Sequence, residues 1–240
     1  MIRSRHILRD FDAALDSLRA EVLMMASLTD RNLQNAMGCL LDRDAELCAL
    51  TIAGEMEIDA LEKSVDREGV DILLRFQPVA SDLRFIVSTM KLGNNLERIA
   101  DQAVKIAHRA RKLELDEPLE EDCALGPMFI EVSNLFRDSV RSYADGDMAL
   151  ARSIRYRDRE IDQMNREITD GLTLKMAADP ARVADHLNLL FVARHLERVG
   201  DHAKNIGEDA VYAAEAHDIR HPNNILEVYE PSISDERWKK

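Results

Sequence analysis

The chain has 240 residues and a formal net charge of −13 at pH 7. This length allows one or two domains, and the apolar content is sufficient for a sizeable core. The negative charge argues against nucleic-acid binding through a basic surface. It favours metal cations or a basic patch on a partner protein as ligands.

No targeting or cross-linking pattern is evident. The start, M-I-R-S-R-H, is not followed by the apolar region of a signal peptide. No apolar run approaches the roughly 20 residues of a membrane-spanning helix, so we expect no direct membrane insertion. Cys39, Cys48 and Cys123 form neither a zinc pattern nor a disulfide framework, which fits a reducing cytoplasm.

Apolar residues spaced three and four apart predict two long helices at the start of the chain. The first runs from about Ser4 to Leu41. A turn at Asp42-Arg43-Asp44 follows, and Asp44 is well suited to cap the second helix. That helix ends at Gln77-Pro78, because proline breaks helix interiors.

A third helix is expected next, capped by Ser81 or Asp82 and continuing to about Ala110. The polar stretch from Glu114 to Asp122 contains Pro118 and reads as a linker.

The second half repeats this plan. A helix is predicted from Phe129 to Tyr143, after a break that includes Pro127. Asp145-Gly146-Asp147 matches Asp42-Arg43-Asp44 at an offset of about 103 residues, and Ala178-Asp179-Pro180 ends the following helix. A last helix with a clean apolar seam extends to about Ala213.

We therefore predict an all-α fold of two tandem, homologous three-helix bundles with six long helices. Helices of about 30 residues would each be about 45 Å long. The predicted divisions are a first repeat at 1–113, a linker at 114–122, a second repeat at 123–216 and a tail at 217–240.

Paired carboxylates are the most specific feature of both halves. L-E-R-I-A-D at Leu96–Asp101 recurs as L-E-R-V-G-D at Leu196–Asp201, and each copy places Glu and Asp one helical turn apart. The second helix of each half carries a matching pair. The eight residues are Glu55, Asp59, Glu97, Asp101, Asp158, Asp162, Glu197 and Asp201.

The spacing predicts that these carboxylates lie beside the apolar seam and face outwards. Outward helix positions carry charge in many proteins, so a single pair of this kind indicates little. Four pairs at equivalent places favour a site for hard, oxygen-preferring cations such as Fe, Mn or Mg, with Zn also considered. His186 and His195 are expected on the helix surface.

An enzyme is the first alternative. Ferritin-like carboxylate–metal enzymes carry Glu-x-x-His inside a four-helix bundle, and this chain contains no such motif. Nucleotide-binding loops and nucleophile motifs are also absent from the sequence, so we expect no catalytic residues and no organic cofactor. The second alternative is a metal-free helical adaptor whose acidic residues are only solvated.

Together with R-F-Q-P-V-A-S-D-L-R at Arg75–Arg84 and D-I-R-H at Asp218–His221, the two repeated motifs resemble those of the PhoU family of phosphate-signalling proteins. The resemblance extends from about Phe11 to His221. It implies a cytoplasmic regulator of phosphate uptake that keeps phosphate-starvation genes off when phosphate is plentiful.

The implied partners are the nucleotide-binding subunit of a phosphate ABC transporter, a sensor histidine kinase and a second copy of the chain. Some family members bind iron or other metals through E(D)-x-x-x-D motifs, which fall here on the eight carboxylates given above. One departure is Asp158, because the second repeat begins its first motif with Asp where the first repeat has Glu55. The shorter side chain reaches less far.

Overall fold

The computed structural model describes residues 9–113 and 122–220. Within these residues it contains six α-helices, one 3₁₀ turn and no strand, in agreement with the all-α prediction. The elements are α1 (Arg9–Leu41), α2 (Ala45–Phe76), α3 (Ala80–Ala110), α4 (Asp122–Asp145), α5 (Met148–Ala178), η1 (Pro180–Arg182) and α6 (Val183–Glu215).

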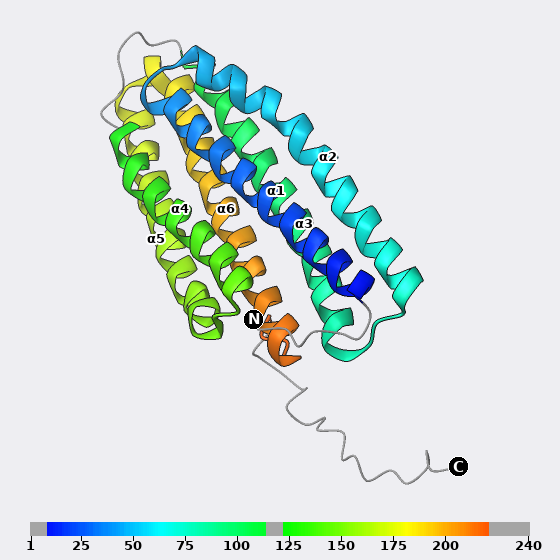
Figure 1. The fold of residues 1–240 in the computed structure, drawn as a ribbon. Coiled ribbons are helices and arrows are strands. Elements are labelled where there is room, and N and C mark those ends of the chain that lie inside the picture. The colour runs from blue at the N-terminus through cyan, green and yellow to red at the C-terminus, as the bar shows by residue number, and fades with distance from the viewer. Residues whose placement is uncertain (1–8, 114–121, 221–240) are drawn as a thin grey trace.

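The helices form two antiparallel three-helix units side by side (Figure 1). α1, α2 and α3 pack on one another in the first unit, and α4, α5 and α6 do so in the second. The units meet mainly through α3 and α6, with α1 also contacting α4. α2 and α5 therefore lie on the outside of the assembly, each against one of the two central helices.

The apolar seams of α3 and α6 occupy equivalent places in the core. Leu96 and Ile99 are fully buried, as are their counterparts Leu196 and Val199 one hundred residues later. Buried apolar side chains from all six helices form one continuous cluster through both units. No helix in the described residues is long and apolar enough to cross a membrane.

The duplicated turn is confirmed in detail. Asp44 caps α2 by accepting hydrogen bonds from the amides of Glu46 and Leu47, and Asp147 caps α5 by accepting from Leu150. Arg43 and Gly146, the middle residues of the two turns, have φ angles of 55° and 69°. Both turns therefore pass through the left-handed region, where glycine is favoured and arginine is strained.

Two helix starts differ from those predicted. α3 begins directly after the break at Pro78, with Val79 at the N-cap position, two residues before the expected cap at Ser81. α4 begins at Asp122 and contains Pro127 as its sixth residue, where the missing N–H removes one hydrogen bond in the second turn. The predicted start of the first helix at Ser4 lies outside the described residues, as does the linker predicted at 114–122 apart from Asp122, which belongs to α4.

The cysteine prediction is wrong for one pair, because Cys39 and Cys48 form a disulfide. Cys39 lies in the last turn of α1 and Cys48 in the first turn of α2, and the tight connection brings their Cα atoms to 4.9 Å. This separation is within the range that a disulfide spans. Spacing in the sequence does not reveal it, because the contact depends on how the two helices turn.

The histidine prediction is also wrong, because His186 and His195 are buried. His195 belongs to the interface of α3 and α6, where its Nδ1 atom lies 2.9 Å from the Oε1 atom of Gln102. His202 and Asn95 make the equivalent contact at 3.1 Å. Position 95 corresponds to 195 and position 102 to 202. The offset of 100 residues therefore relates the two contacts, and in both of them the histidine is on α6 and its amide partner is on α3.

Candidate functional site

The first acidic cluster, defined as Glu55, Asp59, Glu97 and Asp101, lies between α2 and α3. All four side chains are partly buried. Burial raises the pKa of Glu55 above its ordinary value, and the charges of Asp59 and Asp101 raise it further. The carboxylates of α2 and α3 therefore repel one another across the helix pair. The sequence predicted such repulsion only between the two members of each pair.

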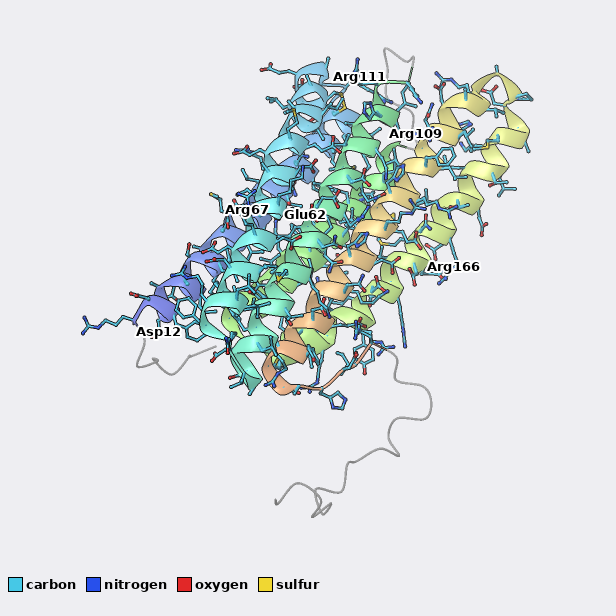
Figure 2. All side chains as sticks on the ribbon, turned by 90° about the vertical axis from the view of Figure 1, so that its right-hand side faces the viewer. Asp12, Glu62, Arg67, Arg109, Arg111 and Arg166 are labelled. Atoms are coloured by element: carbon cyan, nitrogen blue, oxygen red, sulfur yellow. A yellow bond between two sulfur atoms is a disulfide. The ribbon has the colours of Figure 1, made fainter. Side chains whose placement is uncertain are left out.

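Positive and amide groups surround this cluster unevenly. Lys105 Nζ lies 2.5 Å from Asp101 Oδ2, and Arg98 Nε lies 3.3 Å from Glu97 Oε2. Glu62 continues the acidic line along α2 (Figure 2). It accepts a hydrogen bond from Asn94 of α3. In the described part of the chain, no lysine or arginine contacts Glu55 at ion-pairing distance.

The second acidic cluster, defined as Asp158, Asp162, Glu197 and Asp201, lies between α5 and α6 at the equivalent place. Asp158 is buried, with 4% of its surface exposed, and the other three are partly buried. Burial raises the pKa of the Glu197 carboxyl, and the charges of Asp201 and Asp162 add to this effect. The carboxylates of α5 and α6 therefore influence one another, as in the first cluster.

One lysine bridges the second cluster. Lys204 Nζ lies 2.5 Å from Asp158 Oδ2 and 2.6 Å from Asp201 Oδ1, so a single ammonium joins carboxylates on two helices. These hydrogen bonds hold the pKa of Lys204 above its ordinary value, although burial opposes this. Burial raises the pKa of Asp158, and the ammonium opposes that rise.

A polar cavity of about 410 Å³ opens beside the second cluster. Asp158, Asp162 and Lys204 line it together with two arginines of α5, Arg155 and Arg159. The sequence reasoning missed Lys105, Lys204 and both arginines. For the lysines a signal was present, because Lys105 follows Asp101 by four residues and Lys204 follows Asp201 by three, which are the spacings of helical ion pairs.

The outward orientation predicted for the carboxylates is therefore only partly correct. Each pair lies beside the seam as expected, but the neighbouring helix covers it to some extent. Across the described residues, no three histidine, cysteine, aspartate or glutamate side chains converge closely enough to hold a metal ion. The metal role of the eight carboxylates stays a prediction.

The chemistry of the donors fits a hard cation. Both clusters present carboxylate oxygens, which suit Mg²⁺, Mn²⁺ or iron. Asp158 Oδ1 is buried and has no hydrogen-bond partner among the described residues. A buried oxygen of this kind is costly unless positive charge lies close to it, and the Lys204 ammonium, which bonds the other oxygen of the same carboxylate, supplies such charge.

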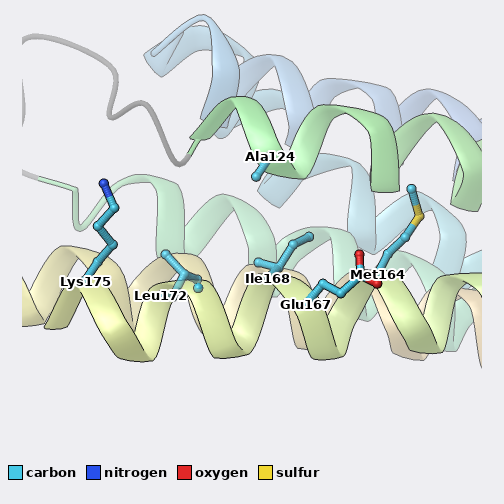
Figure 3. A pocket seen from close by; sticks show the side chains of 7 residues that line it. Ala124, Met164, Glu167, Ile168, Leu172 and Lys175 are labelled. Atoms are coloured by element: carbon cyan, nitrogen blue, oxygen red, sulfur yellow. The ribbon is translucent and has the colours of Figure 1, made fainter. Parts of the chain in front are cut away.

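A separate apolar pocket of about 350 Å³ lies between α4 and α5 (Figure 3). Met164, Ile168 and Leu172 of α5 line it on one side and Ala124 of α4 on the other. No carboxylate of either acidic cluster contributes to its lining.

Comparison with known proteins agrees with this duplicated architecture. The PhoU domain family matches residues 22–110 and 125–210. A protein from Pseudomonas putida, named phosphate-specific transport system accessory protein PhoU homolog, is 35% identical over 91% of this chain and 86% of its own length. The corresponding protein of Serratia marcescens is 30% identical over 91% of this chain and 90% of its own length.

Solved structures lead to the same family. The crystal structure of PhoU from Pseudomonas aeruginosa has a TM-score of 0.84 and 33% identity, covering 86% of this chain and all of that one. The phosphate transport system regulatory protein PhoU from Streptococcus pneumoniae has a TM-score of 0.81 and 25% identity, covering 88% of this chain and all of that one. The chain belongs to the PhoU family.

Proposed function

We propose that this protein regulates phosphate uptake and represses the phosphate-starvation response. The observation that carries the proposal is similarity along about nine tenths of the chain to proteins named as accessory to phosphate-specific transport. We further propose that it acts without catalysis, as an adaptor between the nucleotide-binding subunit of a phosphate ABC transporter and a sensor histidine kinase.

Two features of the described chain support an adaptor. A single continuous core joins the two units. A partner that binds one face can therefore move both units together as a rigid body and change the position of the opposite face. The net charge of −13 favours basic patches on partner proteins. Coupling requires that the protein binds the phosphate-replete and the starved states of a partner with different affinity.

The first experiment is deletion of the protein followed by a reporter of a starvation gene at high phosphate. We expect the reporter to stay on, and complementation with the intact chain to turn it off again. Unchanged expression in the deletion strain would contradict the regulatory proposal. A phosphate-uptake assay in the same strains separates an effect on the transporter from an effect on transcription.

We also propose that metal binding at the acidic clusters contributes to this role. A variant carrying Glu97→Gln, Asp101→Asn, Glu197→Gln and Asp201→Asn should lose the Fe, Mn, Mg or Zn that elemental analysis detects in the wild type. A matched variant neutralises four exposed carboxylates outside the clusters, at Asp16, Glu57, Glu160 and Asp170. It makes the same change in net charge and should keep the metal.

The same measurements test two alternative functions, a metal-free adaptor and a carboxylate–metal enzyme. A metal-free adaptor is favoured by the ammonium groups of Lys105 and Lys204, which already neutralise part of each cluster. In that case the cluster variant keeps its signalling, and metal is absent from wild type and variant alike. A carboxylate–metal enzyme would instead show metal-dependent turnover, which we expect to be absent.

A cytoplasmic location and a homodimer complete the proposal. Reducing compartments keep most cysteine pairs as thiols, so the Cys39–Cys48 bond makes location worth measuring directly by cell fractionation. Light scattering coupled to size-exclusion chromatography measures the mass in solution against the 27.2 kDa of one chain.

A further inference from the structure

The ammonium of Lys204 lies between carboxylates of two helices in the second cluster. Its Nζ atom contacts Asp158 of α5 and Asp201 of α6 at 2.5 and 2.6 Å. The ammonium therefore makes two charge-assisted hydrogen bonds across the helix pair, and such bonds are stronger than those between neutral groups. With 24% of its side chain exposed, Lys204 is partly shielded from water.

The close approach of Asp158 to α6 makes this arrangement possible. A Cβ atom on Gly200 would lie 3.4 Å from Asp158 Oδ1, so the carboxylate rests over the glycine. The first repeat has alanine at the equivalent position, Ala100, and the longer Glu55 opposite it. The short carboxylate and the glycine together bury Asp158, and a buried carboxylate depends strongly on a paired cation.

The first cluster has no equivalent of this bridge. Position 104, which corresponds to 204, is a buried valine with 5% of its surface exposed. Lys105 pairs with Asp101 alone and has 42% of its side chain exposed, so water screens its charge more strongly. In the described residues, no lysine or arginine lies at ion-pairing distance from Glu55, whereas Asp158 is paired with Lys204, so the negative charge of Glu55 is less fully compensated.

We propose that Lys204 is the built-in cation of the second cluster, so that a divalent metal binds the first cluster and is kept out of the second. A metal entering the second cluster must displace an ammonium that is hydrogen-bonded to both Asp158 and Asp201. Arg155 and Arg159, which line the adjoining cavity, add further repulsion. This inference rests on the metal role proposed above and assigns it unequally to the two repeats.

The test is titration of the purified, chelator-treated full chain with MnCl₂ alone, followed by the electron paramagnetic resonance signal of free Mn²⁺. Lys204→Met removes the ammonium and keeps an unbranched side chain that is one heavy atom shorter. We expect it to bind more Mn²⁺ than the wild type does, with affinity at the second cluster at least about tenfold tighter. Adding Asp158→Asn and Asp201→Asn to this variant should abolish the gain.

Two control variants separate charge from packing. Lys204→Arg keeps the positive charge and should bind no more Mn²⁺ than the wild type. Lys105→Met removes the lysine of the first cluster and should leave the second cluster closed. If circular dichroism shows that Lys204→Met has lost helix, Lys204→Gln replaces it in the same titration.

The outcomes distinguish this inference from the broader proposal. If Lys204→Met gains no Mn²⁺, or if Asp158→Asn with Asp201→Asn removes bound Mn²⁺ from the wild type, Lys204 does not exclude the metal. A gain in Lys204→Met with no binding at all in the wild type would support Lys204 as the excluding group, and would overturn the metal role of the first cluster. Regulation of starvation genes is measured separately, in cells.

Discussion

The two acidic clusters share four carboxylate positions but differ in what neutralises them. In the second cluster a partly buried lysine bridges α5 and α6, whereas in the first a more exposed lysine pairs with a single aspartate. Three changes between the repeats accompany this difference: Glu55 against Asp158, Ala100 against Gly200, and Val104 against Lys204. Equivalent motifs therefore do not imply equivalent electrostatics.

The cores of the two repeats are more alike than their acidic clusters. The seam residues that hold the helices together are buried to the same extent in both repeats, and the contact of His195 with Gln102 mirrors that of His202 with Asn95. The packing of the two halves has stayed alike while the charged surroundings of the carboxylates have diverged.

The largest expected effect tests whether the two cores contribute equally to stability. Leu96→Ala and Leu196→Ala each remove a fully buried side chain at equivalent positions. Each should lower the free energy of unfolding by about 2–5 kcal/mol, because a cavity replaces the lost contacts. Urea unfolding followed by circular dichroism measures both losses. Clearly unequal losses would show that the two cores are not energetically equivalent.

The next largest expected effect tests whether Lys204 contributes more to stability than Lys105 does. Lys204→Met leaves the buried Asp158 without its cation and should cost about 1–3 kcal/mol of stability. Lys105→Met removes a more exposed ion pair and should cost less than about 1 kcal/mol. Thermal unfolding in parallel compares them. Similar losses from both substitutions would mean that the bridge contributes no more than a surface pair.

A pH titration examines the interface between the repeats. Burial and the charges of Arg198, Lys105 and Arg109 lower the pKa of His195 from 6.5 to about 4. In that interval the unfolded chain binds a proton that the folded chain does not, so stability falls as the pH drops from about 6.5 to about 4.

The variant His195→Asn carries at position 195 the residue that occupies the equivalent position 95. It should remove this loss of stability, which is at most about 3 kcal/mol. Urea unfolding at several pH values gives the slope for wild type and variant. His217→Gln is the matched control, because His217 is exposed. An unchanged slope in the His195 variant would assign the pH dependence to other groups.

The smallest expected effect concerns repulsion in the first cluster. Burial and two neighbouring carboxylates raise the pKa of Glu55, so its ionised form is unfavourable in the folded chain. Glu55→Gln should stabilise the protein by about 0.2–1 kcal/mol at neutral pH. The gain should disappear below the ordinary carboxyl pKa of 4.5, where the wild-type side chain is protonated in both states.

Chemical unfolding of Glu55→Gln at pH 7 and pH 4 gives both values. Glu57→Gln lies two residues away, in an exposed position with a distant partner, and should change stability by only a few tenths of a kcal/mol. A loss of stability in Glu55→Gln at pH 7 would mean that the ionised carboxylate has a favourable contact.

Signals within single segments of the chain are sufficient to predict the helices, the duplication and the family. Apolar spacing of three and four, the caps at Asp44 and Asp147 and the break at Pro180 are local signals, and local backbone preferences decide where helices begin and end. Repetition of L-E-R-I-A-D as L-E-R-V-G-D located the acidic pairs on their helix faces, because helical periodicity is a property of one segment alone.

What lies opposite those faces depends on how the helices pack. The burial of Asp158, the bridge from Lys204, the contact of His195 with Gln102 and the Cys39–Cys48 bond all join residues on different helices. Each depends on how two helices are rotated and spaced, which periodicity within one helix does not specify. The charge balance of each acidic cluster follows from that packing.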